Sequence, residues 1–380
     1  MANIIETKGK LFVGGDGNDN FSIGGYQYDP DAFGFRPYTS SANNTLNGGA
    51  GDDDLSVQGS EGDNLLNGDA GDDTLDTSYL LVGDSGPYLI PSEGNNTLNG
   101  GAGDDRLYAN SSSGNNLLNG DDGNDSLFSY GFFQIEQGRY YDIVPGNNTL
   151  NGGAGNDRLD IDYSTGNNLL SGGDGKDTLD IGYSTGNNLL SGGDDNDSLS
   201  ASGGYGYNGG LPEVYREASG NNTLDGGAGN DTLSIDNSTG NNVLSGGDGN
   251  DSLSASAALG NNTLNGGTGN DTLIGGSGTD TFVFNSFNEG IDSLYGFNAT
   301  NELIQVSAAG FDCRLSIGSL KASQFTIGTS ATTCAQRFIY DFTTGALYFD
   351  RDGSGGSFTQ IQFAQLFGGV SLTENNFVVV

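Results

Sequence analysis

The sequence offers one residue type with clear chemical potential, an aspartate that recurs at a fixed position of a glycine-rich turn. The turn has the form Gly-Gly-x-Gly-x-Asp, with single substitutions in some copies, and occurs eleven times. Its sixth position is held by Asp19, Asp53, Asp73, Asp105, Asp125, Asp157, Asp177, Asp197, Asp231, Asp251 and Asp271. Carboxylate and carbonyl oxygens in a flexible loop favour Ca²⁺ over Mg²⁺. The turns are therefore candidate calcium sites.

The aspartate turns alternate with asparagine turns, which mostly read Gly-Asn-Asn. Asn168, Asn188, Asn242 and their equivalents stand where an aspartate would bind calcium. Stacked asparagines can form a ladder of amide hydrogen bonds, and the alternative is that this edge recognises a partner. Asp280, in the sequence GGSGTD, falls on the asparagine side without an acidic neighbour. We therefore do not expect a complete metal site at Asp280.

Leucine recurs between the turns, mostly at alternating steps of nine and eleven residues, as at 46, 55, 66 and 75. A helix would show apolar steps of three and four, so the elements are strands of about three residues with one inward side chain. Two strands and two turns make a coil of 20 residues, and stacked coils pair each strand with its equivalents. The fold class is all-β, a parallel β-roll (β-solenoid) of about eleven coils.

Stacking also brings the acidic turns together on one side of the roll. Their carboxylates would repel unless a divalent cation neutralised them. A plain turn-forming role for aspartate is the alternative, but eleven copies in one register favour metal binding. In three turns Asp69, Asp121 or Asp195 replaces a glycine, so those sites would be distorted or carry extra charge.

These turns, all but the first followed by x-Leu, resemble the RTX nonapeptide repeat GGxGxDxUx over about residues 11–283. The resemblance implies a non-toxin member whose sixth-position aspartates bind roughly ten calcium ions between successive turns, with backbone carbonyls completing each site. It also implies folding driven by calcium. The region from 281 to 380, which ends in FVVV, is similar to the C-terminal segment of RTX proteins exported by type I secretion.

The amino-acid composition argues against several classes of function. The net charge of -37 argues against nucleic acid, which is bound through Lys and Arg. Histidine is absent, which excludes HExxH zinc sites, Ser-His-Asp triads and Cys-His pairs. We therefore expect a protein that is not an enzyme. A polysaccharide-active enzyme would need two facing carboxylates, for which Glu136, Asp142 and Glu213 are the candidates.

Neither an N-terminal secretory signal nor a membrane-spanning run is present. The resemblance to RTX proteins implies an extracellular or cell-surface protein that is secreted without such a signal. Cys313 and Cys334 could pair in an oxidising compartment or remain free thiols.

Four insertions interrupt the repeat, at 24–40, 77–91, 129–143 and 201–217, each between an acidic-turn strand and an asparagine turn. They hold 15 of the 37 aromatic residues. The candidate partner-binding residues are Tyr26, Tyr28, Phe33, Phe35, Tyr130, Phe132, Phe133, Tyr140, Tyr141, Tyr205 and Tyr215. Either the loops pack on one another, or their aromatic side chains bind another subunit or a polysaccharide.

The expected domains are the roll, 1–280, and a small β-rich cap, 281–380, in which Asp350 and Asp352 could hold one further calcium ion. The leading functional hypothesis is a secreted, calcium-dependent structural protein of a bacterial cell surface, matrix or filament that associates with itself. The alternative is a calcium-dependent glycan-binding adhesin.

Overall fold

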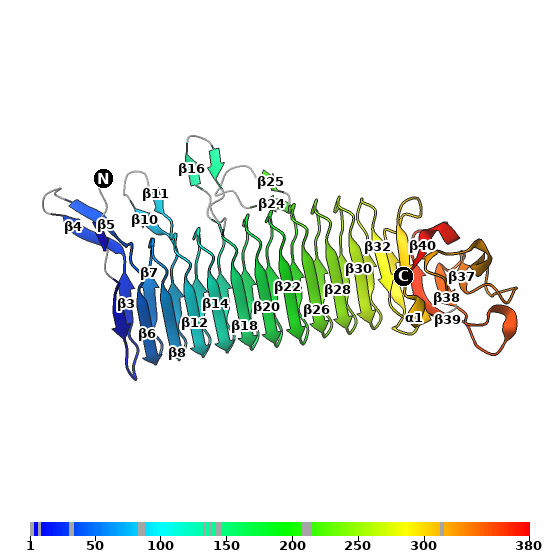
Figure 1. Cartoon of the computed structure of the whole chain (residues 1–380), viewed down its shortest axis with the longest axis horizontal. Coiled ribbons are helices and arrows are strands. Elements are labelled where there is room, and N and C mark those ends of the chain that lie inside the picture. Colours follow the sequence, from blue (N-terminus) through cyan, green and yellow to red (C-terminus); the bar gives the residue numbers. More distant parts are fainter. Residues whose placement is uncertain are drawn as a thin grey trace. The chain divides into compact units, whose positions relative to one another are not determined.

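The structure of the chain is a computed structural model (Figure 1). It describes residues 4–6, 9–29, 34–82, 88–131, 134–136, 139–141, 146–206, 214–216, 218–311 and 315–380. Two compact units are present. Unit 1 comprises residues 1–193 and 205–216, and unit 2 comprises residues 194–204 and 217–380.

Unit 1 consists of stacked coils, each contributing one strand to each of two parallel sheets. The long-strand sheet has the order β2 (Leu11–Val13), β6 (Thr45–Ala50), β8 (Leu65–Ala70), β12 (Thr97–Ala102), β14 (Leu117–Asp122), β18 (Thr149–Ala154), β20 (Leu169–Asp174) and β22 (Leu189–Asp194). The short-strand sheet has the order β3 (Asn20–Ile23), β7 (Asp54–Val57), β9 (Thr74–Asp76), β13 (Arg106–Tyr108), β15 (Ser126–Phe128), β19 (Arg158–Asp160) and β21 (Thr178–Asp180).

Unit 2 has the same two-sheet design. Its long-strand sheet has the order β26 (Thr223–Ala228), β28 (Val243–Asp248), β30 (Thr263–Thr268), β32 (Thr281–Phe284), β34 (Leu303–Val306), β40 (Phe377–Val379) and β35 (Gly318–Ser319). Its short-strand sheet has the order β23 (Ser198–Ser200), β27 (Thr232–Ser234), β29 (Ser252–Ser254), β31 (Thr272–Ile274), β33 (Asp292–Tyr295), β39 (Ile361–Leu366), β38 (Ala346–Phe349), β37 (Phe338–Asp341) and β36 (Phe325–Ile327).

The leucines occupy the register that their spacing predicts. Leu46 pairs with Leu66 in one sheet and Leu55 pairs with Leu75 in the other, and all four side chains are fully buried. The residues on either side of each leucine point outward because side chains alternate along a strand. The core is thus a column of leucines, and the fold class is confirmed as a parallel β-roll.

The expected strand length of three residues is right for one sheet and wrong for the other. The long strands mostly have six residues, as in β12 with the sequence TLNGGA. Pairing continues through the glycines because these turns stack closely; a Cβ on Gly103 would lie 2.1 Å from the carbonyl oxygen of Gly71. Gly103 also has φ of 137°, where L side chains are strained. The acidic turn is therefore an extension of the long-strand sheet.

The three turns with a substituted glycine keep a positive φ at the substituted position. Asp69, Asp121 and Asp195 have φ of 79°, 74° and 74°. Aspartate tolerates the left-handed region better than most residues do, because its short side chain can bond locally. The substitutions therefore add charge to these turns without opening them.

The end of unit 2 departs from the 20-residue coil. Parallel pairing continues beyond residue 280, from β30 to β32 and on to β34. Antiparallel strands β37, β38 and β39 then extend the short-strand sheet over buried aromatic side chains, which include Phe311, Phe338 and Phe363. Its helices are short: α1 (Ala308–Phe311), η1 (Ala322–Gln324), η2 (Gly353–Gly355) and η3 (Glu374–Asn376). This aromatic core forms the expected β-rich cap.

Each of the four insertions contains paired strands. In three of them these form two-stranded sheets: β10 (Leu80–Val82) with β11 (Tyr88–Ile90), β16 (Gln134–Glu136) with β17 (Arg139–Tyr141), and β24 (Gly204–Gly206) with β25 (Val214–Arg216). In the first, β4 (Gly25–Asp29) and β5 (Gly34–Ser40) are antiparallel, and β1 (Ile4–Glu6) pairs with β5. Figure 1 shows β10–β11 and β16–β17 leaving the same edge of the coils of unit 1. In the part of the chain that is described, no helix has the length and apolar character needed to span a membrane.

Candidate calcium-binding edge

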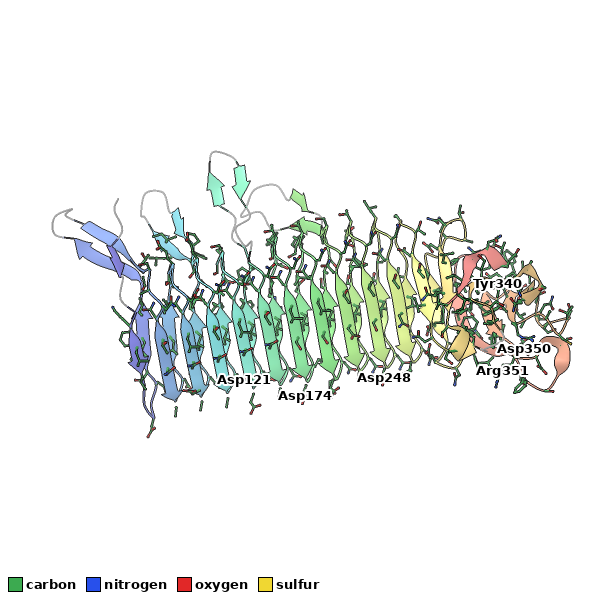
Figure 2. The ribbon with its side chains drawn as sticks, in the orientation of Figure 1. Asp121, Asp174, Asp248, Tyr340, Asp350 and Arg351 are labelled. Carbon is green, nitrogen blue, oxygen red and sulfur yellow. The ribbon has the colours of Figure 1, made fainter. Side chains whose placement is uncertain are left out.

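The sixth-position aspartates form a ladder along one edge of the coils. The backbone N–H of each donates to the Oδ1 atom of the aspartate in the next coil, as from Asp73 to Asp105 and from Asp105 to Asp125. These distances are 2.6–2.8 Å from Asp19 to Asp177 in unit 1 and from Asp197 to Asp271 in unit 2. Figure 2 shows Asp121 and Asp174, from acidic turns of unit 1, on the same edge. One oxygen of each carboxylate is thus fixed by the backbone of the neighbouring coil.

The other carboxylate oxygen is buried and accepts no hydrogen bond within the described structure. This holds for the Oδ2 atoms of Asp53, Asp73, Asp105, Asp125, Asp157, Asp231, Asp251 and Asp271. The residues themselves are at most 3 % exposed. A buried acceptor without a partner is costly, and more so when it is charged. A repeated set of such oxygens indicates a ligand that supplies positive charge.

In several turns the unpartnered oxygen and a carbonyl oxygen from the next coil both lie beside the first glycine of the turn. A Cβ built on Gly68 would lie 2.1 Å from Asp73 Oδ2 and 2.6 Å from the carbonyl oxygen of Gly100. For a Cβ on Gly120 the distances are 2.2 Å to Asp125 Oδ2 and 2.6 Å to the Gly152 carbonyl oxygen. Oxygens of two successive coils therefore converge where a side chain would otherwise stand, which explains the glycine.

Burial raises the pKa values of several of these carboxyl groups in the metal-free protein. The pKa is raised to about 7 for Asp105 and Asp251, and to about 6 for Asp73, Asp125 and Asp157. Desolvation is the largest cause, and the charges of neighbouring aspartates add to it, whereas the backbone hydrogen bond to each carboxylate lowers the pKa. The edge holds more negative charge than its surroundings stabilise, and a cation would relieve this.

The ladder continues to Asp292, which the sequence interpretation missed. Its Oδ1 accepts a hydrogen bond from Asp271 N at 3.1 Å, and the residue is 4 % exposed. Burial and the charge of Asp271 raise its pKa to about 8. The available signal was Asp292-Ser-Leu294, which repeats the Asp-x-Leu found at all acidic turns but the first, although the preceding residues lack the glycine pattern.

At the start of unit 1 the acidic turn differs. Asp19 Oδ2 accepts a hydrogen bond from Gly15 N at 2.9 Å, so it is engaged within its own turn. In interior turns such as those of Asp53, Asp105 and Asp251, this oxygen is buried and has no hydrogen-bond partner within the described structure.

The asparagine edge is the hydrogen-bonded ladder that the sequence predicts. The Asn64 side-chain amide donates to Asn96 Oδ1 at 2.8 Å, and Asn96 donates in the same way to Asn116 at 3.0 Å. Each amide also donates to a carbonyl in its own turn, as from Asn64 to Gly62 at 2.7 Å. The buried asparagines satisfy one another, so this edge needs no cation. Whether it also recognises a partner stays a prediction.

Asp280 ends the asparagine ladder of unit 2 as a hydrogen-bond acceptor. Its Oδ1 accepts from the Asn262 side chain at 3.0 Å, and its Oδ2 accepts from Gly276 N at 2.7 Å. Both oxygens of Asp280 are engaged, but the buried Glu302 beside it keeps Oε1 without a hydrogen bond in the described structure. The absence of a complete metal site at Asp280 therefore stays a prediction.

Asp350 and Asp352 lie in a loop of the cap. Asp350 is 6 % exposed, and its Oδ1 accepts from Asp352 N at 3.1 Å and Gly353 N at 3.0 Å. Asp352 Oδ2 accepts from Ser357 N at 2.7 Å. These bonds give the two aspartates a turn-stabilising role, and a calcium ion at this loop stays a prediction.

The candidate partner-binding aromatics fall mostly outside the described side chains. Only Tyr130 has a described side chain, which meets Phe128 edge to face at 5.8 Å between ring centroids. Phe33, Phe132 and Phe133 lie outside the described residues. For the strand residues the structure describes the backbone alone; these are Tyr26, Tyr28, Phe35, Tyr140, Tyr141, Tyr205 and Tyr215.

The carboxylates considered for catalysis are also not described. Asp142 and Glu213 lie outside the described residues, and Glu136 is described only by its backbone in β16. The absence of enzymatic activity stays a prediction. Cys334 is exposed, with Sγ 3.7 Å from Ser354 Oγ. Its pairing with Cys313 is untested because Cys313 lies outside the described residues.

Comparison with family profiles identifies the repeats. The profile of the RTX calcium-binding nonapeptide repeat matches ten segments between residues 38 and 288, which together cover more than half of the chain. The chain belongs to the RTX calcium-binding nonapeptide repeat family. Proteins with these repeats are typically exported by type I secretion. A search of curated proteins found no match.

The donor set of the acidic edge suits calcium in this RTX chain. Among the described residues no three carboxylate, thiolate or imidazole groups gather in one cluster, so the carboxylates alone do not make a cage. The sixth-position aspartates together with glycine carbonyls of adjacent coils, such as Gly100 and Gly152, would supply the oxygen ligands. Calcium takes six to eight such ligands in variable geometry. When bound, it would neutralise the column of carboxylates and join successive coils.

Proposed function

We propose that this RTX protein is a secreted structural protein of a cell surface or extracellular matrix, which folds on binding calcium and then associates with itself. The observation that carries the calcium-dependent step is the repeated buried carboxylate oxygen without a hydrogen-bond partner, as at Asp105 and Asp251. An ionised oxygen in that position opposes folding until a cation compensates it.

Calcium concentration would then act as the folding signal. In a low-calcium cytosol the aspartate column repels itself and the chain stays unfolded, whereas outside the cell metal binding drives folding. Roughly ten ions, one between successive acidic turns, would contribute about +20 of charge. Against a formal net charge of -37 this leaves an acidic surface.

The first coil of unit 1 supports self-association. Phe12 and Phe21 stack at 5.2 Å between ring centroids but are only half-buried, whereas the inward leucines of the next coil are fully buried. Strands β2 and β3 stand first in their sheets and pair on one side only within the described residues. Leu11 and Val13 of β2 are 68 % and 66 % exposed. An apolar strand edge of this kind readily pairs with another chain.

Light scattering of the calcium-loaded protein tests this role. We expect large particles for the unmodified chain and a monomer for the double variant Leu11→Lys, Val13→Lys, because charges on an edge strand oppose pairing. Leu259→Lys is the matched control, since Leu259 is 62 % exposed but lies outside the strands. All three proteins should give the same β signal in circular dichroism. A monomeric unmodified protein in calcium would show that self-association is wrong.

A further inference from the structure

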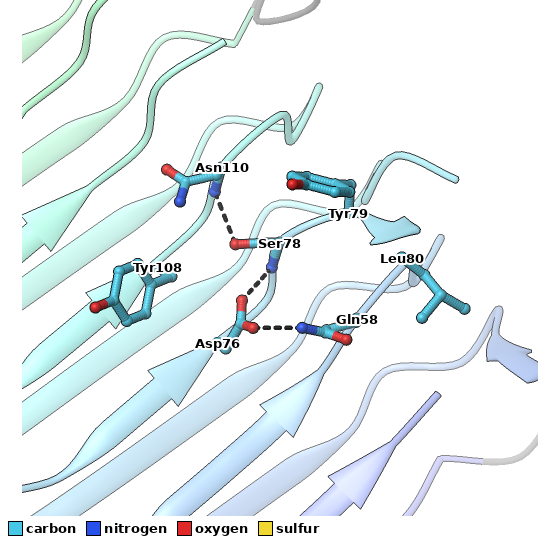
Figure 3. Close-up of a pocket in the computed structure, with 7 residues that line it drawn as sticks. All are labelled: Gln58, Asp76, Ser78, Tyr79, Leu80, Tyr108 and Asn110. Atoms are coloured by element: carbon cyan, nitrogen blue, oxygen red, sulfur yellow. Dashed lines mark hydrogen bonds between the residues drawn. The ribbon is translucent and has the colours of Figure 1, made fainter. Parts of the chain in front are cut away.

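A groove on the outer face of the short-strand sheet of unit 1 has the size and lining of a small-molecule site (Figure 3). Its volume is about 450 Å³, and it lies beside the β10–β11 insertion. The polar lining residues are Gln58, Asp76, Ser78 and Asn110, and the aromatic ones are Tyr79 and Tyr108. Ligand sites typically combine aromatic surface with a few fixed polar groups.

The groove arises from a change of side-chain size between neighbouring coils. Tyr108 and Asp76 are register partners at the outward position after the buried leucine. The next partner, Phe128, stacks on Tyr108 with ring centroids 5.4 Å apart and planes 11° apart. Phe128 therefore supports one face of the Tyr108 ring, and the shorter Asp76 leaves space beside the other. The result is a rigid aromatic wall next to a hollow.

Hydrogen bonds hold the polar groups of the groove in place. Asp76 accepts from the Gln58 side chain at 2.5 Å and from Ser78 N at 2.8 Å, and Ser78 Oγ accepts from Asn110 N at 3.1 Å (Figure 3). Three polar atoms have no partner in the described structure: Gln58 Oε1, Asn110 Nδ2 and the Tyr108 hydroxyl. A preorganised set that keeps both donors and acceptors available can bind a ligand at little conformational cost.

The chemistry of the lining selects a neutral, hydroxyl-rich ligand. The groove has no lysine or arginine among its described lining residues, and Asp76 would repel an anion. Carboxylate and carboxamide groups suit hydroxyls that both donate and accept hydrogen bonds. The face of an aromatic ring is electron-rich and apolar, which suits the C–H face of a pyranose ring. A sugar presents both surfaces at once.

We propose that this groove binds a neutral pyranose unit of a glycan, with the sugar ring stacked on Tyr108 and its hydroxyls bonded to Gln58, Asp76 and Asn110. This goes beyond the structural role proposed above and requires only that the coils of unit 1 be folded. Such binding would attach the calcium-loaded protein to surface polysaccharide.

Binding of the folded, calcium-loaded full chain to a printed panel of neutral hexose and N-acetylhexosamine oligosaccharides tests the proposal. We expect the unmodified chain to bind at least one of these oligosaccharides. The Tyr108→Ala variant should bind the same oligosaccharide with about tenfold lower affinity. Asp76→Asn keeps the shape of the groove and should also weaken binding, because a charged acceptor makes the stronger hydrogen bond.

The matched control is Tyr295→Ala. Tyr295 also follows a buried leucine and stacks on an aromatic ring, Phe367, at 4.5 Å, but it lies on β33 of unit 2. It should leave glycan binding unchanged. Circular dichroism must first show that each protein has the β signal of the unmodified chain. The assignment is overturned if the folded chain retains none of these oligosaccharides, or if Tyr295→Ala weakens retention as much as Tyr108→Ala does.

Discussion

At the scale of the residue, interior aspartates of the acidic edge such as Asp73, Asp105 and Asp251 divide their two oxygens between two tasks. Oδ1 accepts the backbone N–H of the neighbouring coil, and Oδ2 stays buried without a hydrogen bond. The first oxygen places the carboxylate, and the second is available to a cation. We therefore expect that asparagine, which completes the hydrogen-bonded ladder of the opposite edge, cannot replace aspartate here.

Asp105→Asn tests that division. It should lower calcium affinity at its own site by about tenfold, since even supporting residues of metal sites contribute that much, as measured by equilibrium binding. Asp104→Asn, on the exposed neighbour in the same turn, should have little effect. Equal losses in the two variants would mean that general negative charge, and not the buried oxygen, binds the metal.

The raised pKa values predict opposite effects of pH on the metal-free and calcium-loaded protein. The pKa of Asp105 is about 7 in the folded chain against an ordinary value of 3.8, so the folded state holds protons that the unfolded state has lost. Any stability of the metal-free coils is therefore greatest at low pH and is lost as pH rises through about 6 to 7. Calcium competes with those protons, so calcium affinity should rise over the same interval. Thermal melts at several pH values, in chelator and in calcium, would measure both trends, and parallel trends would contradict the account.

At the scale of the element, the two edges of a coil are stabilised differently. The side-chain amides of the asparagine turns are hydrogen-bonded to one another. In the acidic turns some carboxylate oxygens have no hydrogen bond, and glycine leaves the space that they occupy. The asparagine edge should therefore hold its structure independently of metal.

Asn116→Ala should destabilise the calcium-loaded protein by about 1–3 kcal/mol, because buried polar groups of Asn96 and Asn148 lose their partner. Denaturant unfolding in saturating calcium measures this. Asn115→Ala is the control, since Asn115 is exposed and water can replace its hydrogen bond. The ladder would be unimportant if both variants unfolded at the same denaturant concentration.

Gly120→Ala should cost about 1–3 kcal/mol of stability, as overpacking does, and should also weaken calcium binding. The new Cβ would lie within 2.2 Å of Asp125 Oδ2. Gly17→Ala, in the first acidic turn, is the control because nothing lies within 4 Å of its Cβ position. Unchanged calcium affinity in Gly120→Ala would remove the converging oxygens from the proposed site.

At the scale of the whole molecule, the repeat explains what the sequence could predict. The leucine spacing determined the two parallel sheets, and the positions of aspartate and asparagine determined the two edges. The six-residue length of the long strands was not predictable from leucine alone, because pairing continues through glycines that usually mark turns. Asp292 was not predicted because the residues before it lack the Gly-Gly-x-Gly pattern of the other acidic turns. The sequence did not predict the groove, because Asp76 and Tyr108 are separated by the insertion 77–91 and become neighbours only when their strands pair.

The most direct test of the central claim is far-ultraviolet circular dichroism of the purified chain in excess chelator, followed by titration with calcium. The account predicts little β signal in chelator at pH 8 and a cooperative gain as calcium is added, with magnesium much less effective. A full β signal in excess chelator at pH 8 would contradict it, because the buried carboxylates would then be tolerated without a metal.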